Sequence, residues 1–259
     1  MSFAILIPCH DEAETIKPIL DEIKKVMQEH QFKIVIVDDG SQDTTAHIAK
    51  QYTSDIIHHP VCKGVGAATK TGLQYISRMW DIEYVIKMDG DGQHSVNFLP
   101  LVAEALDQGC DFVVCSRFHH CSAQLDTDRE RIMLNLSFKS LVNTVTGWSL
   151  ADVRTGFMGF RAQDICRIAH RIILEGYGIP MELILRLWQL KPHARIAEFA
   201  HPADYRSILS KKIAAKLASK TVESEAERFL TMYRALIRVL DDMRVSTQDL
   251  LRVNGYAHH

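Results

Sequence analysis

The sequence has no Cys-x-x-Cys pair and no apolar run close to the roughly 18 residues that a helix needs to span a bilayer. Its six cysteines are therefore not spaced as a metal or redox motif, and we expect reduced thiols in a cytoplasmic protein. We also expect no signal peptide, because the first residues read as a strand. Any membrane contact is expected to be peripheral, at the cytoplasmic face.

Net charge, repeats and low-complexity segments are equally scarce. The chain carries 30 basic and 32 acidic residues, a net charge of −2, which gives no overall basic field for nucleic acid. No internal repeat or low-complexity linker divides its 259 residues, a length that can bury one large core. We therefore expect one domain over residues 1–220, a helical extension at 221–259, and no nucleic-acid partner.

Apolar runs and amphipathic segments alternate along the chain. Strands are expected near residues 3–7, 33–37, 56–57, 84–88, 112–115 and 195–199, and within 152–161. Helices are expected near residues 16–26, 45–52, 66–79, 98–106, 133–145 and 181–189. This alternation predicts an α/β fold with a mostly parallel, doubly wound sheet and flanking helices. Ligands of such sheets bind beyond the carboxyl ends of the strands, where the acidic loops of this chain fall.

Two aspartates separated by one glycine end the strand that begins at Tyr84. In an extended backbone residues i and i+2 point the same way, so Asp89 and Asp91 are expected to direct their carboxylates at one point. Carboxylates held that close repel unless a cation lies between them, and their hard oxygens suit Mg²⁺ or Mn²⁺. Gly90 lacks a Cβ atom and would let a phosphate approach the backbone. A solvated glycine-rich turn is the competing interpretation.

Five motifs occur in an order that resembles one enzyme family. They are Pro8–Glu12, Val37–Thr44, Lys63–Ala68, Asp89–His94 and Thr155–Phe157. Together they resemble the family 2 inverting glycosyltransferases, and within that family the dolichol-phosphate mannosyltransferase group, which uses polyprenyl phosphates. The resemblance covers about residues 1–211. It implies a GT-A fold, with a nucleotide-sugar-binding half at about 1–117 and an acceptor half at 118–220.

The resemblance assigns the first two motifs to the nucleotide of the donor. Pro8, Asp11 and Glu12 match the family's first-strand motif, with Asp11 in place of the usual Asn. Asp39 matches the acid that hydrogen-bonds the base, and Asp38 is its neighbour. A carboxylate accepts equally from uracil and guanine, so UDP and GDP both stay open.

The next two motifs match the diphosphate and metal sites of the family. Lys63 belongs to a loop near the diphosphate, where backbone amides and a cation favour anions. Asp91 matches the metal ligand, and Asp89 shares the metal or contacts the ribose. Gln93 and His94 are close to the family's pattern and would line the sugar or acceptor pocket.

The second half matches the family less closely. Arg206 and Lys211 stand where the family has an Arg and a Ser-Lys pair that clamp the two phosphates, although the spacing is shorter here. Arg117 follows Ser116 as in the family's Gly-Ser-Arg element, but Cys115 replaces the Gly.

A basic stretch and an apolar stripe close the sequence. Residues 206–220 carry five basic residues and no acid, and Lys212, Lys216 and Lys220 would share one helix face. Such a face suits an anionic membrane or a phosphate, and it also suits a merely solvated helix. Apolar residues then repeat at helical spacing, with Leu230 and Ile237 beside them: Phe229, Tyr233, Leu236, Leu240 and Met243. This stripe suits the core, a membrane-anchoring partner or a dimer contact.

The expected function depends on the acceptor. A phosphate monoester has a second pKa of about 6 and is a nucleophile at neutral pH, whereas a sugar hydroxyl needs a carboxylate base. Hydroxyl-using relatives place an Asp in a late Glu-Asp pair, and the nearest substitutes here are Asp152 and Glu182. The resemblance therefore implies a metal-dependent hexosyltransferase acting on a polyprenyl phosphate. A soluble transferase to a hydroxyl and a non-catalytic nucleotide-sugar-binding protein stay open.

Overall fold

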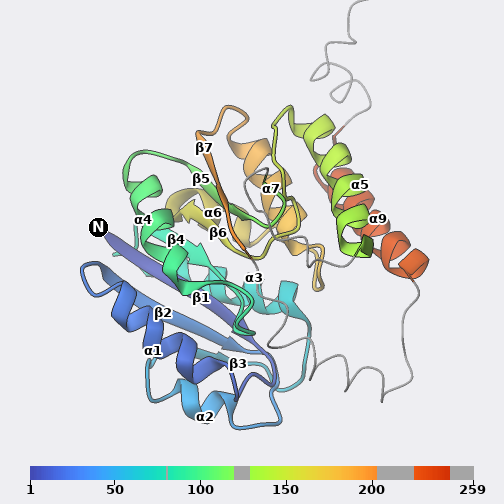
Figure 1. Cartoon of the computed structure of the whole chain (residues 1–259). Helices are drawn as coiled ribbons and strands as arrows, with labels where there is room; N and C mark the ends of the chain where they lie inside the picture. The colour runs from blue at the N-terminus through green and yellow to red at the C-terminus, as the bar shows by residue number, and fades with distance from the viewer. Residues whose placement is uncertain (80, 120–128, 203–224, 246–259) are drawn as a thin grey trace, which may run out of the picture.

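A seven-stranded sheet in the order β3-β2-β1-β4-β6-β5-β7 forms the centre of the protein (Figure 1). The computed structural model describes residues 1–79, 81–119, 129–202 and 225–245. The strands are β1 (Ser2–Cys9), β2 (Gln31–Asp38), β3 (Ile56–His58), β4 (Tyr84–Lys87), β5 (Phe112–Ser116), β6 (Met158–Arg161) and β7 (Ile196–Ala200). β6 runs antiparallel to β4 and β5, and the other neighbouring pairs are parallel. The predicted mostly parallel α/β sheet is confirmed, with one reversed strand.

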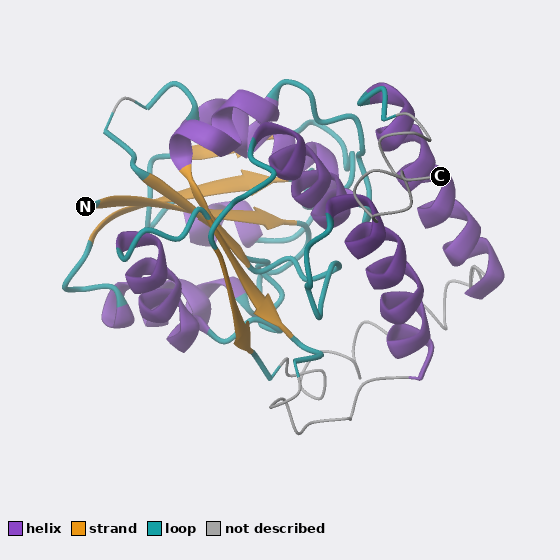
Figure 2. Cartoon of the chain, turned by 90° about the horizontal axis from the view of Figure 1, so that it is seen from above, coloured by secondary structure: helices purple, strands orange, loops and turns teal. Residues whose placement is uncertain are grey.

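Helices cover both faces of this sheet, as the two views show (Figures 1 and 2). One apolar cluster includes residues of α1 (Ile16–Val26), α2 (Thr45–Ala49), the 3-10 turn η1 (Val96–Phe98) and α4 (Leu99–Asp107). The other includes residues of α3 (Val65–Ile76), α5 (Arg129–Thr146), α6 (Ala162–Ala169), α7 (Ile179–Leu190) and α9 (Glu225–Asp242). Within the described ranges, none of these helices combines the length and apolarity that a membrane crossing needs.

β1 shows how the sequence sets the two faces. The clusters receive alternate residues of this strand: Phe3, Ile5 and Ile7 on one side, Ala4 and Leu6 on the other. Successive side chains of a strand point to opposite faces, so a strand that is apolar at every position is buried on both. β1 lies between β2 and β4, so its carboxyl end lies between the ends of these two strands.

Two elements differ from the expectation. β1 runs through Pro8, where we expected it to end; β4 pairs with β1 from Phe3 to Leu6, so the missing N–H of Pro8 falls where β1 has one neighbour. α6 was not expected, although Ile165 and Ile168 are spaced for one helix face. Its two turns offer too few periodic positions to be told from a loop by pattern alone.

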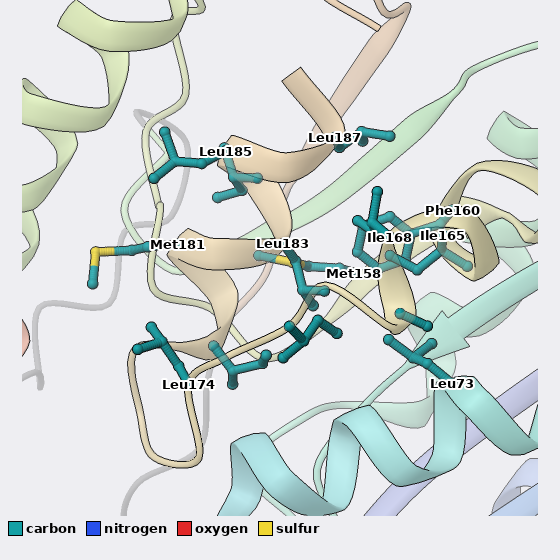
Figure 3. Close-up of a cluster of buried hydrophobic side chains, with 14 of the residues drawn as sticks. Leu73, Met158, Phe160, Ile165, Ile168, Leu174, Met181, Leu183, Leu185 and Leu187 are labelled. Atoms are coloured by element: carbon teal, nitrogen blue, oxygen red, sulfur yellow. The ribbon is translucent and has the colours of Figure 1, made fainter. Parts of the chain in front are cut away.

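α9 packs against the rest of the domain. Buried residues recur at helical intervals along α9 and one position past its end: Met232, Leu236, Val239 and Met243. They join the apolar cluster built around α7, part of which is drawn in Figure 3. The core-facing stripe is thus confirmed for Leu236 and Met243, whereas Tyr233 is 40% exposed. Leu230 and Ile237 are exposed on the same helix.

Candidate active site

Four carboxylates gather where β1, β2 and β4 end. Glu12 follows β1, Asp38 ends β2, and Asp89 and Asp91 follow β4. The buried thiol of Cys9 lies within electrostatic reach of all four carboxylates. Burial raises the pKa of this thiol, and the negative charge of each carboxylate raises it further. The acidic loops therefore meet at one edge of the sheet, as the predicted topology requires.

Asp89 is paired with Lys87, the last residue of β4. The Lys87 ammonium is 2.6 Å from Oδ1 of Asp89 and donates to the carbonyl of Gly156 at 3.1 Å. Lys87 is 2% exposed, so this ammonium belongs to the interior of the site. Burial acts to raise the pKa of Asp89, but the charge and hydrogen bond of Lys87, together with His94 and Arg117, outweigh it, and that pKa is lowered to about 2. Asp89 is therefore ionised at neutral pH.

The extended backbone expected from Asp89 to Asp91 is wrong, whereas the convergence of the two carboxylates on a metal stays a prediction. β4 ends at Lys87, and Gly90 and Asp91 lie in a turn. The alternation of an extended chain therefore brings Lys87 and Asp89 together instead. Oδ1 of Asp91 accepts from the amide of Gln93 at 3.0 Å and so closes the turn.

Two buried histidines shape the loop after β4. Nδ1 of His94 accepts from the amide of Asp89 at 3.0 Å, and Nε2 of His201 accepts from the amide of Ser95 at 2.9 Å. Burial lowers the pKa of His94 to about 3 and that of His201 to about 4, so both rings are neutral at pH 7. Both rings also contact Phe157. His201 was missed from the sequence because it follows β7, far along the chain from the Asp89 motif.

Two glycines leave room around this loop. A Cβ at Gly156 would lie 2.4 Å from Oδ2 of Asp89, so the residue opposite Asp89 has to lack a side chain. A Cβ at Gly90 would lie 2.7 Å from the sulfur of Cys9. Packing against β1 accounts for Gly90, and the phosphate contact expected there stays a prediction.

Asp39 is bound to the turn that precedes α3. Its Oδ1 lies 2.6 Å from Nδ1 of His59 and accepts from the amide of Lys63 at 3.0 Å, and its Oδ2 accepts from the amide of Gly64 at 2.7 Å. Burial raises the pKa of Asp39, but the hydrogen bonds from His59 and the two amides outweigh it and lower that pKa. The carboxylate expected to face the nucleobase thus holds the Lys63 turn in this structure.

The first amides of α3 are engaged as well. Those of Gly66 and Ala67 donate to the carbonyl of Glu175 at 2.7 and 3.2 Å. The amides of Lys63, Gly64, Gly66 and Ala67 thus donate within the protein in this structure, and the expected contact of this loop with the diphosphate stays a prediction. The exposed Lys63 side chain is the part of the turn that suits an anion.

Asp11 and Asp38 shape the loops after β1 and β2. Asp11 has a φ of 52°, in the left-handed region that Asp and Asn tolerate, and its Oδ1 accepts from the amide of Gln42 at 2.7 Å. Asp and Asn both supply that acceptor, so the loop forms without the family's usual Asn. Oδ1 of Asp38 accepts from the amide of Ser41 at 3.2 Å, and its Oδ2 is 3.0 Å from Nδ1 of His58.

Asp152 and Glu182, the nearest substitutes for the family's base, are both buried and hydrogen-bonded. The guanidinium of Arg117 forms a bidentate ion pair with buried Asp152. Nε donates to Oδ2 at 2.7 Å and Nη2 donates to Oδ1 at 2.9 Å. Burial raises the pKa of Asp152, but Arg117 outweighs it and lowers that pKa. The oxygens of Glu182 accept from the amides of Ile173 and Leu174, each at 2.8 Å. Neither carboxylate is placed to take a proton from a sugar hydroxyl.

A divalent cation suits the acidic edge in charge and ligand chemistry, because Asp89 and Asp91 offer hard carboxylate oxygens. In the part of the chain that the structure describes, no group of three or more His, Cys, Asp or Glu side chains is arranged to hold a metal ion. Such an ion would need further oxygen ligands, and Mg²⁺ commonly takes these from phosphates and water. Arg206 and Lys211, the expected phosphate clamps, lie outside the described residues, as does the rest of 206–220.

Comparisons with known proteins show the family of this chain. The family model described as glycosyl transferase family 2 matches residues 4–167. Undecaprenyl-phosphate mannosyltransferase of Micrococcus luteus is 25% identical over 197 residues, 73% of this chain and 79% of that protein. Polyprenol monophosphomannose synthase of Mycolicibacterium smegmatis is 24% identical over 190 residues, 70% of each chain.

A solved structure shows the same fold. Glucosyl-3-phosphoglycerate synthase of Mycobacterium tuberculosis, in complex with Mn²⁺, UDP and phosphoglyceric acid, has a TM-score of 0.61 at 14% identity, covering 95% of this chain and 79% of that one. Complexes of that enzyme hold Mn²⁺ or Mg²⁺. The sheet of this chain is thus the mixed, mostly parallel sheet of the GT-A fold.

Proposed function

Because this chain belongs to glycosyl transferase family 2, we propose that it is a metal-dependent hexosyltransferase that moves a sugar from a UDP- or GDP-linked donor to a polyprenyl phosphate. Two relatives named for making phosphate-linked mannose on polyprenols span 73% and 70% of the chain. The acidic edge after β1, β2 and β4, with Lys63 exposed on the turn that Asp39 holds, supports a nucleotide-sugar donor.

One observation carries the choice of acceptor. Among the described residues, the two nearest substitutes for a base that activates a hydroxyl, Asp152 and Glu182, are buried and already bonded to Arg117 and to backbone amides, respectively. A hydroxyl acceptor needs a base within hydrogen-bond reach, whereas a phosphate monoester, with a second pKa of about 6, does not. The described residues therefore suit a nucleophile that arrives ionised.

The proposed reaction is a displacement at the anomeric carbon of the donor sugar. An acceptor phosphate oxygen forms the new bond to this carbon while the bond to the donor diphosphate breaks, and the electron pair leaves with the diphosphate. The configuration inverts, from an α-linked donor to a β-linked product. A Mg²⁺ or Mn²⁺ ion held by Asp91 and Asp89 would supply positive charge for the departing diphosphate. Lys87 keeps Asp89 ionised and in place for that role.

A donor and acceptor screen tests this function. The full chain is incubated with radiolabelled UDP- or GDP-sugars, Mg²⁺ or Mn²⁺, and polyprenyl phosphate, and the lipid is extracted. Label in a lipid that mild acid releases is the expected result. Label confined to a water-soluble glycan would favour the hydroxyl-linked alternative, and nucleotide-sugar binding without turnover would favour the non-catalytic one.

Contact with the membrane surface is part of the same proposal, because the acceptor is a lipid. The basic stretch 206–220 and the exposed apolar residues Leu230, Tyr233 and Ile237 of α9 support it. Cosedimentation with anionic and with neutral vesicles provides the test. We expect binding to anionic vesicles that high salt weakens; equal binding to neutral vesicles would contradict an electrostatic contact. A dimer through α9 instead would appear as a doubled mass in solution.

A further inference from the structure

A chain of ion pairs joins the C-terminal helix α9 to α7. Nη2 of Arg186 on α7 is 2.7 Å from Oδ2 of Asp242, the last residue of α9. Nε of Arg186 is 2.9 Å from Oε1 of Glu182, one turn earlier on α7. Arg186 is 1% exposed and Glu182 is fully buried. Buried charges need directed partners, because an unpaired charge in the interior is costly.

Glu182 in turn holds the loop between α6 and α7. Its two oxygens accept from the amides of Ile173 and Leu174, each at 2.8 Å. The carbonyl of the next residue, Glu175, accepts from the first amides of α3, those of Gly66 and Ala67. Figure 3 shows Leu174 on this loop, beside α3.

The contact between this loop and α3 has no spare room. A Cβ at Gly66 would lie 2.4 Å from the carbonyl oxygen of Leu174, and a Cβ at Gly64 would lie 2.4 Å from that of Glu175. On its other side the same turn is held by Asp39 through the amides of Lys63 and Gly64. The turn that presents Lys63 is thus fixed from two sides, one of which leads back to α9.

Packing alone does not require charges at this position. Apolar side chains of similar volume often replace a buried ion pair without loss of stability. An apolar pair cannot, however, accept the two amide hydrogens of the loop. The ion pairs therefore set the position of the loop, and through it the position of the turn.

We propose that Arg186, together with Glu182 and Asp242, is a positioning residue that holds the turn at residues 63–67 in its donor-binding geometry. Through Asp242, α9 then contributes to the geometry of the donor site. This role rests on the proposed function, because it assumes that the turn meets the diphosphate of a nucleotide sugar. None of the three side chains touches the donor, and each acts through the loop.

Asp242 offers the safest place to test this role, because its side chain is 44% exposed. Asp242→Ala removes the contact to Arg186, and Asp242→Asn keeps an acceptor oxygen for it. The matched control is Asp164→Asn, which removes a charge from another ion pair of the same region, that of Asp164 with Lys191 at 2.8 Å. The affinities of the full chain for UDP and for GDP are measured by calorimetry with Mg²⁺. Backbone hydrogen exchange at residues 63–67 is followed in parallel.

We expect Asp242→Ala to weaken nucleoside diphosphate binding by about 5- to 10-fold, the range of a modest coupling between sites, and to speed exchange at Gly66 and Ala67. Asp242→Asn should keep most of the affinity, and the Asp164→Asn control should match the wild type. Equal affinity and equal exchange in Asp242→Ala and the control would overturn the positioning role alone. A wild-type chain that binds neither nucleotide would overturn the proposed function and the role in donor binding with it, while the exchange rates would still report whether Asp242 holds the turn.

Discussion

Asp89 and Asp91 are two residues apart, and the protein holds them differently. Asp89 is pinned by the buried Lys87, while Asp91 lies in the turn and accepts from the amide of Gln93. Asp89 therefore already has a fixed counter-charge, and Asp91 is the better candidate to bind an added cation. We therefore propose that Asp91 is the main ligand of the metal.

Replacing Asp91 with alanine should abolish sugar transfer and leave the fold intact. The side chain is partly exposed and supports one turn amide, so its loss costs little packing. Transfer assays across a range of Mg²⁺ concentrations, with a thermal melt of each protein, make the measurement. Wild-type turnover in Asp91→Ala would remove this residue from the mechanism.

Gly156 gives a second residue-scale prediction. In Gly156→Ala the new methyl would meet Asp89, so Asp89 must move away from Lys87. We expect activity to fall at least about tenfold, with a loss of about 1–3 kcal/mol in the free energy of unfolding from overpacking. Gly176→Ala is the control, because a Cβ there has nothing within 4 Å. Similar activity in the two variants would show that the position of Asp89 does not matter.

The neutral histidines predict how stability depends on pH. The folded-state pKa values of His94 and His201, about 3 and about 4, lie below that of an unfolded histidine. The unfolded chain therefore binds more protons, and stability falls as pH drops from about 6.5 toward 4, by about 1–2 kcal/mol per histidine between pH 7 and 5. Denaturant titrations at several pH values measure this loss. His201→Gln should reduce the slope in this window, and an unchanged slope would assign it to other groups.

At the scale of elements, α9 behaves as part of the core. Leu236 is 2% exposed and its neighbour Ile237 is 39% exposed, so one residue faces the core and the next lies at its exposed side. Leu236→Ala should cost about 2–5 kcal/mol of unfolding free energy, because it leaves a cavity against the α7 cluster. Ile237→Ala should cost less than about 1 kcal/mol. A small loss of unfolding free energy in Leu236→Ala would mean that α9 is not part of the core. A separate unfolding transition of α9, before that of the rest of the domain, would mean the same.

The elements with strong periodicity were predictable from the sequence, and those set by distant contacts were not. β1 is apolar at nearly every position and β2 is apolar from Ile34 to Val37, which is typical of buried strands, and the stripe on α9 follows helical spacing. α6 was missed because it is short. The predicted strand ends lie within a few residues of the observed ones. This accuracy was sufficient to predict that the acidic loops lie at one edge of the sheet.

The sequence indicated which loops meet at the sheet edge, and it did not indicate how their residues contact one another. The family resemblance points to Asp39 and Lys63, and the end of the strand that begins at Tyr84 points to Asp89. It does not show that Asp39 binds the Lys63 turn, since that contact depends on how two loops meet. The period of an extended strand would have identified Lys87 as the partner of Asp89. His201 reaches the site only through the order of the strands, which no local pattern contains.

At the scale of the whole molecule, the GT-A sheet brings the donor loops to one edge, and the ion pairs of α7 tie α9 to them. The central claim is that this protein glycosylates a phosphate that needs no base. The most direct test offers the full chain one polyprenol with and without its phosphate, together with its preferred labelled donor and Mg²⁺. The account predicts an acid-labile product from the polyprenyl phosphate and none from the free polyprenol. Equal transfer to the polyprenol hydroxyl would contradict it.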